Sequence, residues 1–222
     1  MLLGNAAMTM PQGVWLAGGS EIPRPQLKPE EVRVFLAEDS EVKREAAVAS
    51  LTEFNLTQGL ITASTYAEAE EFVRAQEPGQ LAANVFLLDG ELDEVQAGGQ
   101  RQGDGLLHLL FEKYSDPIIT HLLNAITSLK LDGFTTRKQI DTIINQGAAF
   151  TAAGDILRKE VLVVGISRTD KGKLSSPAQV PLAPHDAVGA VVFEMVVPEA
   201  TRNKIAKQQR READRARSRD SS

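Results

Sequence analysis

The chain has 222 residues, of which 42% are apolar, so it is long enough to bury one sizeable core. It has no cysteine, which excludes disulfides and thiolate metal sites and fits a reducing compartment. The first twenty residues carry no Lys or Arg, and Pro11 interrupts their apolar character, so we expect no signal peptide, no membrane span and a cytoplasmic location. Residues 1–30 are rich in Gly, Pro and small side chains and predict a disordered or extended leader.

The net charge of −6 is unevenly distributed along the chain. Residues 199–222 carry eight basic and four acidic residues, whereas the first 198 residues carry sixteen basic and twenty-six acidic ones. An acidic body therefore precedes a polar, basic tail. Charges of both signs are more typical of a solvated helix or a disordered end than of a nucleic-acid-binding arm, so we expect no nucleic-acid partner.

The first half of the chain alternates apolar runs with helical patterns. Residues 32–37 predict a buried strand that ends at Glu38 and Asp39, and a helix is expected over 40–51. The two acids therefore lie at a strand-to-helix turn.

A second strand is expected over 60–64, followed by a helix that Thr65 and Glu68 open as a capping box. The third strand, 83–89, ends on Asp89. This β-α-β-α-β order predicts a parallel sheet with right-handed crossovers.

The second half is less regular. A helix is expected over 104–114, and two further helical patterns between about 115 and 158 suggest an inserted hairpin. The apolar run 161–166 predicts a fourth strand ending on Ser167, and the apolar run 189–198 predicts a fifth. The expected body is one α/β domain over 31–198.

Several oxygen-bearing side chains follow these strands. Glu38 and Asp39 follow the first, Asp89 ends the third and Ser167 follows the fourth. Ligands bind outside the carboxyl ends of the strands in open α/β sheets. Carboxylates are preferred ligands of hard cations such as Mg²⁺. The sequence therefore predicts an acidic pocket that binds a divalent cation.

With these elements in order, the chain resembles the receiver domain of two-component response regulators. The resemblance rests on five segments: Phe35-Leu-Ala-Glu38-Asp39-Ser40, Phe86-Leu-Leu-Asp89, Gly103-Asp-Gly105-Leu-Leu, Gly165-Ile-Ser167 and Gly189-Ala190. It implies a doubly wound, flavodoxin-like sheet of five parallel strands. It also implies signalling by protein contacts, without enzymatic output.

The resemblance also implies roles for individual residues. Asp89 would accept a phosphoryl group from a histidine kinase or phosphotransfer protein. Mg²⁺ would be held by Glu38, Asp39, Asp89 and the backbone carbonyl of Glu91. The two remaining implied positions are Ser167, as the hydroxyl that senses the phosphoryl oxygen, and Phe193, as the switch aromatic.

The chain departs from the family in three places. The family has a lysine next to a proline late in strand five, but residues 195–198 are Met-Val-Val-Pro. Lys171 and Lys173 lie in the loop after strand four and could reach the pocket only from there. The insertion at about 115–158 and the basic tail are the other departures. The insertion could complete the core, form a homodimer face or bind a protein partner.

Three functions stay open. The first is a receiver phosphorylated on Asp89, and the second is a pseudo-receiver scaffold that binds its partner without phosphorylation. The third is a Mg²⁺-dependent phosphohydrolase, suggested by the Asp89-Gly-Glu91 sequence after a strand. We expect His108, His121 and His185 to be structural and none of them to act as a catalytic base.

Overall fold

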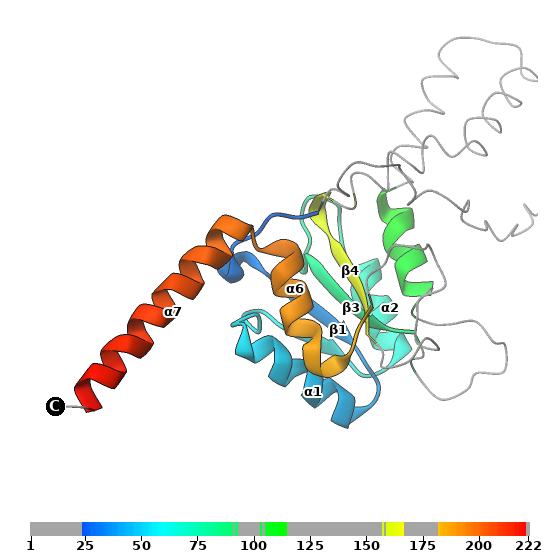
Figure 1. The fold of residues 1–222 in the computed structure, drawn as a ribbon. Coiled ribbons are helices and arrows are strands. Elements are labelled where there is room, and N and C mark those ends of the chain that lie inside the picture. Colours follow the sequence, from blue (N-terminus) through cyan, green and yellow to red (C-terminus); the bar gives the residue numbers. More distant parts are fainter. Residues whose placement is uncertain are drawn as a thin grey trace, which may run out of the picture.

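The computed structural model describes residues 24–90, 92, 103, 105–114, 157, 159–166 and 182–220. Within them, a five-stranded parallel sheet has the strand order β2-β1-β3-β4-β5 (Figure 1). The strands are β1 (Val34–Ala37), β2 (Ile61–Ala63), β3 (Val85–Asp89), β4 (Leu162–Ile166) and β5 (Leu182–Ala183). The predicted α/β class and the five-stranded parallel sheet are confirmed.

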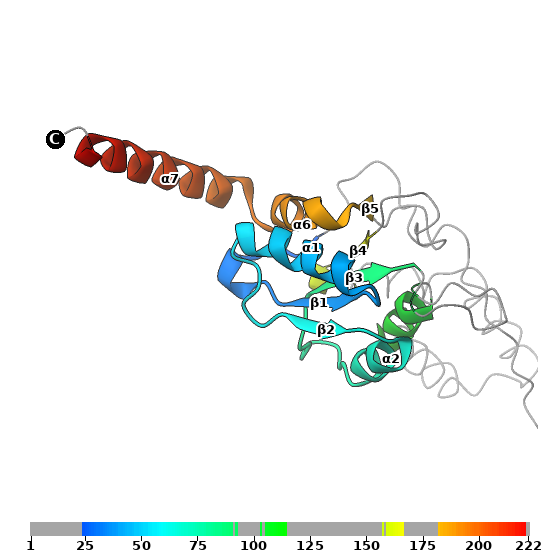
Figure 2. The same ribbon diagram turned by 90° about the horizontal axis from the view of Figure 1, so that it is seen from below.

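Helices cover both faces of this sheet (Figures 1 and 2). The helices are α1 (Glu41–Glu53), α2 (Tyr66–Arg74), the helical residues 105–114, α6 (Val188–Val196) and α7 (Glu199–Asp220). One apolar cluster joins one face of the sheet to α1 and α6, and the other cluster joins the opposite face to α2 and residues 105–114. The short 3-10 helices are η1 (Pro29–Glu31) and η3 (His185–Ala187).

Strands β1, β3 and β4 form where they were predicted because their side chains are apolar on both faces. All residues of β1, β3 and β4 are buried, as expected for parallel strands between two helical layers. Along β1, Phe35 belongs to one cluster and Leu36 to the other. The Phe35 ring stacks on Phe72 of α2, with ring centroids 4.1 Å apart.

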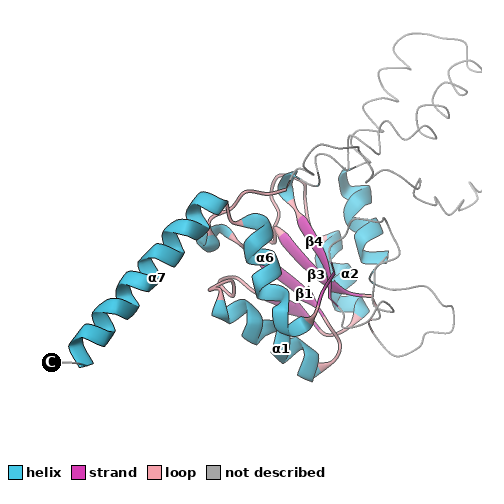
Figure 3. Ribbon diagram, in the orientation of Figure 1, coloured by secondary structure: helices cyan, strands magenta, loops and turns pink. Residues whose placement is uncertain are grey.

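The predicted position of the fifth strand is wrong. Residues 188–196 form helix α6 (Figure 3), and β5 is the shorter segment Leu182–Ala183, which pairs with β4. An apolar run does not by itself distinguish a buried strand from a buried helix. The spacing of the buried residues Val188, Val192 and Val196 is four, which is the helical repeat.

The basic tail forms a helix that extends away from the sheet (Figure 1). Of the two predicted alternatives, solvated helix or disordered end, residues 199–220 adopt the first. The base of α7 is held by an ion pair between Arg202 Nη1 and Glu194 Oε1, 3.9 Å apart.

In the described part of the chain, no helix has both the length and the apolar character needed to cross a membrane. The predicted hairpin at about 115–158 falls almost wholly outside the described residues.

Helix α6 packs very closely on α1. The Gly189 N–H donates a hydrogen bond to Ser50 Oγ at 3.0 Å, and a Cβ atom at Gly189 would lie 2.1 Å from the Ser50 carbonyl oxygen. Only a residue without a side chain fits there. This contact holds the start of α6 on α1, and η3, which directly precedes α6, also packs against α1.

We predict that Gly189→Ala lowers the free energy of unfolding by about 3 kcal/mol, because the added methyl group forces the two helices apart. The loss should occur even though alanine raises intrinsic helix propensity by about 1 kcal/mol. Urea unfolding followed by circular dichroism measures it. Ala190→Ser, at the exposed neighbouring position, is the control and should change stability little. Equal midpoints for Gly189→Ala and the wild type would contradict the close contact.

Candidate functional site

Two strand ends bring the predicted acids to one edge of the sheet. The Glu38 N–H still donates to the Ala63 carbonyl of β2 at 3.1 Å, and the chain then turns at Asp39 into α1. Asp89 is the last residue of β3 and pairs in register with Ile166 of β4. The acids therefore meet between β1 and β3, where the strand order reverses and where open α/β sheets bind ligands.

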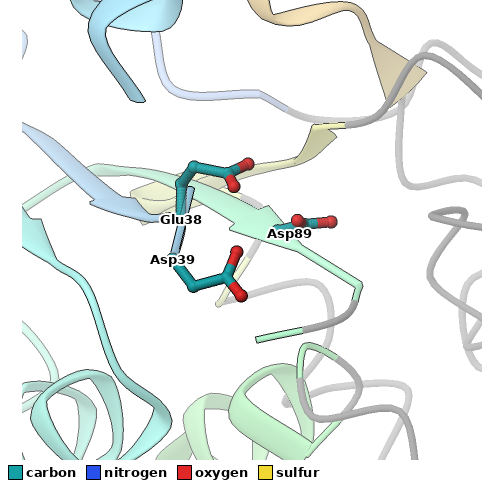
Figure 4. Close-up of side chains that lie close together, drawn as sticks. All are labelled: Glu38, Asp39 and Asp89. Atoms are coloured by element: carbon teal, nitrogen blue, oxygen red, sulfur yellow. The ribbon is translucent and has the colours of Figure 1, made fainter. Parts of the chain in front are cut away.

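The three carboxylates form a cluster (Figure 4). Glu38, Asp39 and Asp89 each offer an oxygen atom, and these atoms lie within 4.8 Å of one another. Glu38 and Asp89 are buried and Asp39 is half-buried. The structure thus brings together the three acids that the sequence singled out.

Of the other predicted site residues, Phe193 is the one that lies among the described residues. Phe193 lies in α6 rather than on a strand at the rim, and its ring centroid is 5.3 Å from that of Phe54. Its predicted strand-five position is therefore wrong. Glu91, Ser167, Lys171, Lys173 and His121 lie outside the described residues.

The Glu38 carboxylate has no exposed surface, but it is well supplied with donors. Its Oε1 accepts a hydrogen bond from the Ser40 N–H at 3.0 Å, and its Oε2 lies 2.6 Å from His185 Nε2. Burial raises the pKa of Glu38, but the hydrogen bonds from His185 and Ser40 and the charge of Lys43 outweigh burial and hold this pKa below the ordinary value of 4.5. Glu38 is therefore ionised at neutral pH, and we assign the shared proton to His185 Nε2 as donor.

Lys43, on the first turn of α1, contacts the cluster directly. Its Nζ lies 3.6 Å from Asp89 Oδ2 and 3.7 Å from Glu38 Oε1, while its side chain is 50% exposed. Burial lowers the pKa of Lys43, but the charges of Asp89, Glu38 and Asp39 raise it above its ordinary value. Lys43 was not among the predicted site residues. Its position, one helical turn after Asp39, was the available signal.

His185 was expected to be structural, and no sequence pattern placed it near the acids. It lies in η3 directly after β5, is 3% exposed, and bonds to Glu38. Its position beside Glu38 was not predicted, because the fifth strand was predicted at 189–198. With β5 at Leu182–Ala183, the sequence Pro184-His185 comes to the same sheet edge as Glu38. Ala183 precedes that proline, so the lysine of the receiver pattern is still absent.

The atoms that the cluster offers as metal ligands are all carboxylate oxygens, which suit a hard divalent cation such as Mg²⁺. The carbonyl oxygens of Glu38 and Asp39 already accept hydrogen bonds from Arg44 Nη1, at 2.9 and 3.3 Å. The side-chain oxygens are therefore the groups suited to hold a cation.

Comparisons with protein-family models, with curated proteins and with solved structures found no match to this chain.

We predict that His185→Phe lowers the free energy of unfolding at pH 7 by about 1.5–3 kcal/mol, because it removes a donor from an ionised, buried carboxylate. The pKa of Glu38 is depressed in the folded state, so its stabilising contribution is present above pH 4.5 and is lost as the pH falls through the folded pKa. The stability gap between variant and wild type should therefore narrow below pH 4.5.

Urea unfolding over a pH series measures this gap. His108→Phe is the matched control, because His108 is partly exposed and pairs with Glu112 on its own helix. A gap that stays constant down to acid pH would show that the ring contributes by packing alone.

Proposed function

We propose that this chain is a receiver of two-component signalling that accepts a phosphoryl group on Asp89. In this proposal Glu38, Asp39 and Asp89 hold Mg²⁺, and a histidine kinase or phosphotransfer protein is the donor. The observation that carries the proposal is the cluster itself. Two buried carboxylates and one half-buried carboxylate lie within 4.8 Å, at the ends of two adjacent parallel strands.

The topology supports the same proposal. The strand order 2-1-3-4-5 is that of flavodoxin-like, doubly wound sheets, which bind ligands where the order reverses. Glu38 follows β1 and Asp89 ends β3, so the two acids flank that point. Helices on both faces of the sheet agree with a doubly wound arrangement. The insertion at about 115–158 would be an addition to this fold.

The proposed reaction needs only a nucleophile and positive charge. One carboxylate oxygen of Asp89 forms a bond to phosphorus, and the bond from phosphorus to the donor's leaving atom breaks, so that the leaving group departs with the electron pair. With acetyl phosphate the leaving group is acetate, which needs no proton. Mg²⁺, when bound, would neutralise the phosphoryl oxygens.

A scaffold that works without phosphorylation is the second candidate. His185 hydrogen-bonds to Glu38 and Lys43 pairs with it, so residues of the chain itself already satisfy part of the acidic cluster. A fold maintained only to bind a partner could use the same contacts for stability. The two candidates differ in whether Asp89 is reactive.

We predict that the purified protein, incubated with acetyl phosphate and Mg²⁺, gains the mass of one phosphoryl group. Asp89→Asn should abolish the gain, because an amide is not a nucleophile for phosphorus, and chelation of Mg²⁺ should also abolish it. Asp214→Asn, at an exposed position of α7, is the control and should be modified like the wild type.

Intact-mass spectrometry measures the gain. An unmodified wild-type protein that binds Mg²⁺ would contradict the receiver proposal and favour the scaffold. Repeated release of phosphate from a phosphomonoester would instead indicate a phosphohydrolase.

A further inference from the structure

Lys43 reaches the proposed phosphoacceptor from a helix rather than from a strand. Its Nζ lies 3.6 Å from Asp89 Oδ2 and 3.7 Å from Glu38 Oε1. We propose that Lys43 is the phosphoryl-binding cation of this site: it neutralises Asp89 before transfer and pairs with the phosphoryl oxygens afterwards. This inference rests on the proposed receiver function.

The charges of the cluster require such a cation. Glu38, Asp39 and Asp89 bring three carboxylates within 4.8 Å, and phosphorylation of Asp89 replaces its single negative charge with close to two. Like charges a few ångströms apart repel strongly unless cations lie between them. An ammonium group beside the acceptor oxygen lowers this repulsion at the atom where the new bond forms.

Two other basic side chains lie near the cluster in the described part of the chain. Arg44 Nη1 donates to the backbone carbonyls of Glu38 and Asp39, and His185 Nε2 donates to Glu38 Oε2. Lys43, in contrast, contacts side-chain oxygens of both Glu38 and Asp89. Its four-carbon stem is half-exposed and flexible, so the ammonium can follow the phosphoryl oxygens after transfer.

The same position makes Lys43 a competitor of the divalent cation. A cation bound by Glu38 and Asp89 would repel an ammonium group that contacts both side chains. Lys43 should therefore weaken Mg²⁺ binding to the unmodified protein and speed phosphorylation once Mg²⁺ is bound. A merely structural residue would not affect these two quantities in opposite ways.

The test compares Lys43→Met and Lys43→Arg with the wild type. Phosphorylation by acetyl phosphate is followed by intact-mass spectrometry at saturating Mg²⁺, and Mg²⁺ affinity is measured separately by isothermal titration calorimetry. We expect Lys43→Met to lower the phosphorylation rate about tenfold to a hundredfold. The same variant should bind Mg²⁺ about threefold to tenfold more tightly. Lys43→Arg should recover most of the rate, because it restores the charge.

Lys28→Met is the matched control. Lys28 is also exposed and also pairs with a glutamate, Glu31, but it lies in the N-terminal segment before β1. A Lys43→Met protein that is phosphorylated at the wild-type rate would overturn the role of Lys43 and leave the receiver function standing. A loss of rate together with weaker Mg²⁺ binding and a lower urea midpoint would also overturn it, by showing a structural role. A wild-type protein that binds Mg²⁺ without being phosphorylated would remove the receiver function and this inference together.

Discussion

The burial of one ionised carboxylate, that of Glu38, constrains much of this fold. An isolated charge removed from water costs several kcal/mol, so the folded chain must supply donors to it. One donor is local, the N–H of Ser40, but the other is His185, which lies 147 positions along the chain. The histidine reaches Glu38 only if η3 sits against the turn between β1 and α1. The close contact between Gly189 and Ser50 then fixes α6 on α1.

The site that results has a rigid part and an adjustable part. Glu38 and Asp89 are fixed by the ends of β1 and β3, whose residues are fully buried, so the distance between the two carboxylates is set by the spacing of the strands. Lys43 balances their charge from a half-exposed side chain with several rotatable bonds. Glu38 and Asp89 cannot move apart, whereas the Lys43 ammonium group can move toward or away from them. The local charge of the site can therefore change with the ligand that it binds.

The sequence was enough to predict β1, β3 and β4, because each is a continuous apolar run between two helical layers. It was also enough to predict the acids, since strand ends follow directly from the strands. It could not place β5, which has only two residues, or recognise that the apolar residues after it form α6. The basic side chains that contact the acids, Lys43 and His185, were missed for a related reason. Lys43 is marked only by its position one helical turn after Asp39, on a helix surface where lysine is common. The position of His185 depends on tertiary packing and follows from no local pattern.

Helix α7 adds a different kind of property to the molecule. With 22 residues and a rise of about 1.5 Å per residue, it spans about 33 Å. Its first turn is tied to α6 through Arg202 and Glu194, and the residues before η1 are tied to the end of α6 by the hydrogen bond from Leu27 N–H to the Val196 carbonyl. A tilt of α7 by about 5° at Pro198 would displace its far end by about 3 Å. A small change in how α6 packs would therefore move the far end of α7 by about the diameter of an atom.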